Sequence, residues 1–196
     1  MRKRLAKFSF LRFVPAAQGN AGVEFALLLP LLVLLLFGGI EISRALHDFH
    51  VVNETVRDAA RYLSQVGADC SAVGVGAGTL KDGPLGSAAD LEKRAKALAI
   101  TGNTNFTSPS SGLLGNWKYP DDASTVTIRV DCTDNAAGVF GGMYEGSSFV
   151  PHIVVIADVP FSFLFGELIV SDPTITITLS HNVAVTGVKF QALPEL

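Results

Sequence analysis

The sequence predicts an α+β protein in which one long N-terminal helix packs on a small antiparallel sheet. Three observations support this prediction. An uncharged apolar run extends from Phe25 to Ile40, and apolar residues then recur every three or four positions as far as Val66. Farther along, three runs show the alternation and the β-branched residues of strands. A helical pattern followed by strand patterns is typical of an α+β fold.

The apolar run is long enough to cross a membrane. The chain has 196 residues, which leaves room for one membrane segment and one domain of ordinary size. A spanning helix needs about 20 residues, and the run reaches that length if it is extended over 20–42. The head, residues 1–19, is basic and lacks acidic residues. The positive-inside rule therefore predicts a cytoplasmic N-terminus and an exported remainder.

An amphipathic extension, residues 43–66, is expected to continue the membrane helix. Neither proline nor glycine occurs between Ile40 and Val66, and Gly67 is expected to end the helix. Its apolar stripe is predicted to face the sheet. The stripe comprises Leu46, Phe49, Val52, Val56, Ala59, Leu63 and Val66.

The remaining part, residues 67–196, reads as an extracytoplasmic α+β domain. The glycine-rich stretch 67–86 and the polar stretch 101–116 are expected to be loops. Ser87 is expected to cap a short helix over 88–99. Strands are predicted at Thr125 to Cys132, His152 to Phe161 and Thr174 to Val185, with an apolar linker ended by Pro173 between the last two.

The two cysteines suit an exported domain. Cys70 follows the helical region and Cys132 ends a predicted strand. An even pair outside the cytoplasm favours one disulfide, which stabilises a fold by roughly 2 to 4 kcal/mol. Two unpaired buried thiols are the alternative, because sequence spacing does not show that the Cα atoms come within bonding range.

Composition and motifs argue against several other functions. Acidic residues number 18 against 15 basic ones, part of which lie in the head, so the exported part is acidic and nucleic acid is not an expected partner.

His47 and His50 have helical spacing but lack a third metal ligand nearby, and Asp131 to Asn135 lacks the spacing of a calcium loop. We expect a solvated helix face and a turn there. The glycines of 74–78 lack the Gly-Lys-Ser/Thr ending of a phosphate loop and read as flexible linker. Because no catalytic constellation is recognisable, neither enzyme activity, a cofactor nor a bound metal is expected.

The start of the span resembles the signal of type IV pilins and pseudopilins, in which glycine precedes an apolar helix that carries a glutamate. Here Gly19 is followed by Glu24 and Phe25. More closely, residues 19–64 resemble the TadE-like family of tight-adherence (Flp-type) pilus systems. The matching features are the Glu-Phe pair, Pro30, then Glu41 with Arg44, and the Ala60-Arg61 pair. Farther along, the predicted strands that flank the Pro160-Phe161 pair also resemble this family, though weakly.

This resemblance implies a pilin-like fold and a role in assembling an adhesive Flp/Tad-type pilus. It implies cleavage after Gly19 by a prepilin peptidase, which makes Asn20 the first mature residue. Major Flp pilins are very short and carry tyrosine where Phe25 stands, so the resemblance favours a minor pseudopilin. The implied partners are the peptidase, other pseudopilins, the Flp-type pilin, the assembly platform and membrane lipid. The implied location is the bacterial inner membrane, as a single-pass protein with a periplasmic domain, or incorporation into the pilus.

Two features of the span, Glu24 and Pro30, have physical interpretations. A carboxylate in a spanning helix costs up to ~3 kcal/mol, and it is tolerated best near an end or beside a partner. If Asn20 is the new terminus, its ammonium group could pair with Glu24 of a neighbouring subunit and set the axial register. An ordinary anchor with an interfacial acid is the alternative. Pro30 either loosens the helix for packing or is merely tolerated.

Two other classes of protein remain open. The chain could be a permanently anchored periplasmic binding or scaffold protein that keeps its head. It could also be a secreted protein released by signal peptidase, since Ser43 and Ala45 supply small residues for that cut. The charges of Glu41 and Arg44 crowd this cut, and the apolar run is longer than a typical signal core.

Overall fold

The long N-terminal helix predicted from the sequence is present. In the computed structural model, residues 18–70, 75–83, 85–165 and 174–186 are described, so most of the basic head lies outside the described residues. Helix α1 extends over Gln18–Ser64 and contains Pro30. The chain divides into two compact units, with the boundary between Ile40 and Glu41.

In the second unit, α1 buries one stripe of its surface. Val52, Val56, Ala59 and Leu63 are almost fully buried, at the three- and four-residue spacing that the sequence predicted. Leu46, however, is exposed, and so is Phe49. The prediction was wrong for these two because helical periodicity gives the direction of a side chain and not how far the facing layer reaches.

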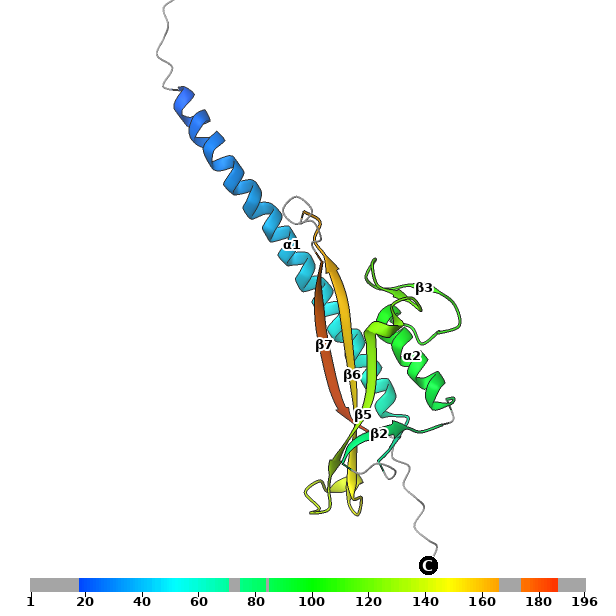
Figure 1. Ribbon diagram of the computed structural model, residues 1–196. Coiled ribbons are helices and arrows are strands. Elements are labelled where there is room, and N and C mark those ends of the chain that lie inside the picture. Colours follow the sequence, from blue (N-terminus) through cyan, green and yellow to red (C-terminus); the bar gives the residue numbers. More distant parts are fainter. Residues whose placement is uncertain (1–17, 71–74, 84, 166–173, 187–196) are drawn as a thin grey trace, which may run out of the picture. The chain divides into compact units, whose positions relative to one another are not determined.

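The core of the second unit lies between helices and one face of an antiparallel sheet (Figure 1). The strand order is β1-β2-β5-β6-β7. The strands are β1 Ala68–Asp69, β2 Gly76–Leu80, β5 Val126–Asp134, β6 Phe149–Ser162 and β7 Thr174–Ala184. Alternate residues of β6 from Ile153 to Phe161 are buried, as expected for a strand with one face against a core. Three predicted strands are thereby confirmed.

The glycine-rich stretch after α1 is not simply a loop or a flexible linker. It contains β1 and β2, and β2 pairs with β5 from Gly76 opposite Cys132 to Gly78 opposite Val130. A Cβ atom on Gly78 would lie 2.7 Å from both the Asp69 carbonyl oxygen and Cys132 Sγ. Glycine is therefore required here by a close approach inside the sheet, whereas the sequence suggested only a breaker.

The predicted short helix and the predicted polar loop follow β2 in the chain. Helix α2 covers Ala88–Thr101, with the Ser87 hydroxyl accepting from the backbone N–H of Asp90 and with Gly102 in the left-handed conformation as C-cap. The predicted polar loop contains β3 Ser110–Ser111, which pairs with β4 Lys118–Tyr119. Two 3-10 turns complete the fold, η1 Ala123–Thr125 and η2 Gly142–Tyr144.

Candidate assembly site on the N-terminal helix

The apolar part of α1 is exposed within its own unit. It belongs to the one helix of the described residues that is long and apolar enough to cross a membrane. Glu24, Phe25 and Pro30 are all exposed on this helix. Gly19 and Asn20 lie within the helix bounds, but their side chains lie outside the described residues. The arrangement leaves the Glu24 carboxylate available to a partner from another chain.

Glu41 has a different environment, although it belongs to the same helix. Its residue surface is only 9% exposed, and both carboxylate oxygens accept hydrogen bonds. The backbone N–H of Phe165 donates to Oε1 at 2.9 Å, and Arg44 Nη1 donates to Oε2 at 3.3 Å. Phe165 belongs to the connection that leaves β6. Glu41 therefore fixes the end of the β6 and β7 pair to α1.

Arg44 extends this contact to the sheet. Its guanidinium carbon lies 5.7 Å from the centre of the Phe161 ring, which is within the range of a cation–π contact. Phe161 is buried and meets Phe163 edge-to-face, with ring centres 5.2 Å apart. Glu41, Arg44, Phe161 and Phe165 together form what we call the helix–sheet clasp. The clasp joins Glu41 to Phe165 and Arg44 to Phe161.

A comparison with protein families finds a similarity on this helix. Residues 19–61 match the family model described as TadE-like protein. Residues 19–61, here called the TadE-like segment, are similar to this family. The match confirms the resemblance seen in the sequence and is consistent with a protein of the Tad pilus systems. No curated protein and no solved structure matches the chain.

Two glutamates of the TadE-like segment lie in different settings. Glu24 lies exposed in the apolar span, and Glu41 lies buried in the clasp. Arg61 lies exposed in the last turn of α1, where a cation complements the negative end of the helix dipole. The segment therefore combines an apolar helix long enough to cross a membrane with the residues that contact the end of β6. Sequence reasoning did not assign Phe165 a role, and its only signal was the unusual apolarity of the linker after β6.

The TadE-like segment also carries an exposed apolar stripe beyond the span. Ile42, Leu46 and Phe49 follow one another at four- and three-residue spacing, and all three are exposed. His47 and His50 are exposed as well. The described residues contain no group of three or more His, Cys, Asp or Glu side chains placed to hold a metal ion.

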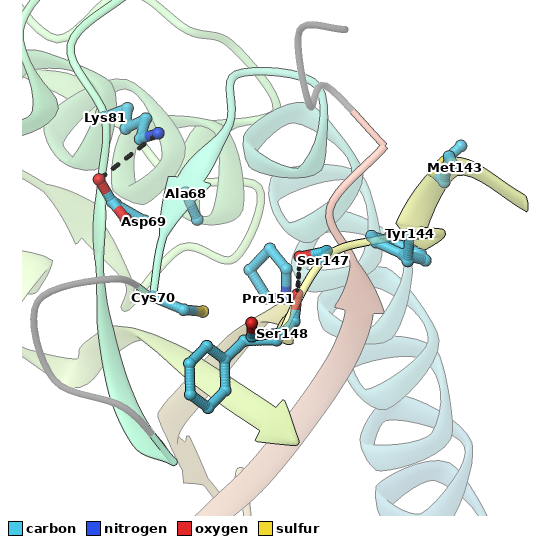
Figure 2. Close-up of a pocket in the computed structure, with 10 residues that line it drawn as sticks. Ala68, Asp69, Cys70, Lys81, Met143, Tyr144, Ser147, Ser148 and Pro151 are labelled. Atoms are coloured by element: carbon cyan, nitrogen blue, oxygen red, sulfur yellow. Dashed lines mark hydrogen bonds and ion pairs between the residues drawn. The ribbon is translucent and has the colours of Figure 1, made fainter. Parts of the chain in front are cut away.

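The two cysteines lie beyond the TadE-like segment, with Cys70 directly after β1 and Cys132 in β5. Cys70 and Cys132 form a disulfide, with Cα atoms 5.8 Å apart, as the sequence favoured. Nearby is an open pocket of about 420 Å³ between β1 and the loop before β6 (Figure 2). The Lys81 ammonium group lies 3.4 Å from the Asp69 carboxylate at its wall, and Ser147 Oγ donates to the Phe149 carbonyl. Both contacts join residues of the pocket wall to one another.

The segment Asp131 to Asn135 is not the turn that the sequence predicted. β5 continues to Asp134, and only Asn135 begins the loop. The Asn135 side chain is buried and donates to three backbone carbonyls of that loop, those of Phe140, Tyr144 and Ser147. Its role is therefore to hold the loop.

Proposed function

We propose that this chain is a minor pseudopilin that takes part in assembling a Tad-type pilus. Residues 20–42 anchor it in the inner membrane, the head lies in the cytoplasm, and the α+β domain lies on the periplasmic side. Its role is structural and needs no catalytic residue. The TadE-like match to residues 19–61 supports the pilus association, and the apolar helix supports the anchor.

The proposed maturation step is cleavage after Gly19 by a prepilin peptidase. The cut removes the basic head and leaves a free ammonium group on Asn20. A new amino terminus at the start of a helix is also where a nearby carboxylate is favoured, because the helix dipole is positive there. Processing would therefore create the group that Glu24 needs as a partner.

The observation that supports this function best is Glu24, an exposed carboxylate in an otherwise uncharged stretch of helix. An unpaired carboxylate near the membrane interior is unfavourable by up to ~3 kcal/mol. The Asn20 ammonium group of the same chain is one helical turn away, at about 6 Å along the axis. Pairing Glu24 with the ammonium group of a neighbouring subunit removes the penalty and fixes the axial register of two helices.

The exposed stripe of Ile42, Leu46 and Phe49 provides a second contact surface for assembly. These side chains lie on α1 at the end of the span and just beyond it, and they have no covering layer in the described part of the domain. A neighbouring pseudopilin helix laid along this stripe would bury them, and burial of one such side chain stabilises by about 1.5 to 3 kcal/mol. The stripe and Glu24 would then act on the same helix pairing.

The test is piliation of cells that carry Glu24→Ala. We expect normal export of the protein and about tenfold fewer surface pili. The loss of one contact worth about 1.4 kcal/mol lowers the equilibrium constant of helix pairing about tenfold. Glu54→Ala is the matched control, since Glu54 is an exposed glutamate of the same helix outside the span. Normal piliation in Glu24→Ala, with the protein present in membranes, would contradict the register role.

A further inference from the structure

We propose that the sheet touches the membrane through an apolar rim at the end where β6 leads into β7. The rim comprises Phe163, Leu164 and Ile175, and its ligand is the headgroup layer of the lipid bilayer. This proposal rests on the membrane anchorage proposed above and adds a second point of contact from a part of the chain that the TadE-like match does not cover.

The rim is unusual in its exposure. Leu164 is 60% exposed and Ile175 is 49% exposed, while Phe163 is half-buried against Phe161. Strand connections that face water are normally polar, with Gly, Asn, Asp, Ser and Pro dominating. Apolar side chains that stay exposed at such a place mark a surface with a partner.

The clasp ties the rim to a defined level on α1. Phe165, the residue after Leu164, donates its backbone N–H to Glu41. Arg44 lies over Phe161, which is paired across the sheet with Ile175. Rim residues are therefore held beside the helical turn that contains Glu41 and Arg44.

That turn lies at the level of the lipid headgroups. The hydrocarbon core is about 30 Å thick and the whole bilayer about 40 to 45 Å, so each headgroup layer is roughly 5 to 7 Å thick. At about 1.5 Å per residue, a helix crosses this layer in roughly three to five residues. The uncharged part of the span ends at Ile40, which places Glu41 to Ala45 in the headgroup layer, and the rim with them.

The chemistry of the rim suits lipid. Leucine and phenylalanine side chains partition into the boundary between headgroups and acyl chains, where amphipathic membrane segments place them. The Arg44 side chain is partly exposed beside them and carries the charge that a lipid phosphate attracts. Contact of the rim with the bilayer would restrict the tilt of the domain before the subunit leaves the membrane.

The test is depth-dependent quenching of tryptophan in the full chain, reconstituted in phosphatidylcholine vesicles with and without brominated acyl chains. Leu164→Trp reports on the rim. Val139→Trp is the control, because Val139 is 76% exposed in the loop at the other end of β6. The 14 residues of β6 separate the two ends by about 40 Å. Leu34→Trp reports on the span. The emission of Trp117 is measured in the parent protein and subtracted from the emission of each variant.

We expect brominated lipid to reduce the emission of Leu164→Trp at least twofold and to leave that of Val139→Trp unchanged. Ile175→Trp is a second reporter with the same expectation should Leu164→Trp fail to fold. If the span reporter is quenched and both rim reporters behave like Val139→Trp, the rim proposal is wrong and the anchor stands. If the span reporter is not quenched, the anchorage itself fails. Blue-shifted rim emission without bromine quenching would mean burial against protein and would also overturn the proposal.

Discussion

At the scale of single residues, two glutamates of one helix illustrate how environment decides function. Glu24 has an exposed carboxylate in the apolar span, and under the proposed function a neighbouring subunit stabilises it. Glu41 is buried and accepts hydrogen bonds from Phe165 and Arg44, so it is satisfied within the chain. A buried acceptor that loses its donors, or a donor that loses its acceptor, costs about 1 to 3 kcal/mol.

The first prediction concerns the clasp. Glu41→Ala removes the acceptor of the Phe165 N–H and the partner of Arg44, so local opening at Phe165 should become about 1.4 kcal/mol easier, or about tenfold more frequent. Amide hydrogen exchange at Phe165 in the detergent-solubilised chain measures this directly.

Glu41→Gln is the matched control for that experiment. It keeps a carbonyl oxygen for the Phe165 N–H and loses only the charge toward Arg44, whose side chain is 37% exposed. Exchange at Phe165 should therefore rise less than in Glu41→Ala. Equal exchange in the parent and both variants would mean that the clasp does not hold the sheet end.

At the scale of elements, the periodic segments were predictable and the closely packed glycine strand was not. Helix α2 was foreseen because Ser87 and the spacing of its apolar residues are local signals. The strands β5, β6 and β7 were foreseen because β-branched residues dominate them. β2 carries no such signal, since it is glycine-rich and owes its pairing to the space left beside β5 and the disulfide.

The second prediction concerns that strand. Gly78→Ala places a Cβ atom 2.7 Å from Cys132 Sγ and 2.8 Å from Val130 Cγ1, so the strand or the disulfide must shift. Overpacking of this kind costs about 1 to 3 kcal/mol in the free energy of unfolding. Urea unfolding of the detergent-solubilised chain, followed by Trp117 fluorescence, measures the loss.

Gly115→Ala is the control for that measurement. A Cβ atom on Gly115 meets nothing within 4 Å, so stability should change by less than about 0.5 kcal/mol. If Gly78→Ala is as stable as Gly115→Ala, the close approach at Gly78 does not explain why glycine occupies this strand.

At the scale of the whole molecule, the fold class was predictable from the sequence, but the contact between α1 and the end of β6 was not. The sequence alone predicted the α+β class, the long helix, the disulfide and the similarity of the N-terminal segment to the TadE-like family. It did not predict the clasp, because Glu41 and Phe165 are far apart in the chain and only the return of β6 brings them together. It also placed Leu46 and Phe49 in the core, where the structure leaves them exposed.

The central claim is that the chain follows the pseudopilin pathway, and the N-terminus of the mature protein tests it most directly. Mass spectrometry of the protein purified from membranes should find a start at Asn20 in cells with the prepilin peptidase. It should find the basic head retained in cells without the peptidase and in the Gly19→Leu variant, because a bulky residue does not fit a site that selects glycine. A head retained in cells that have the peptidase would contradict the pathway and favour a permanently anchored scaffold. A start at Leu46 would identify a secreted protein released by signal peptidase.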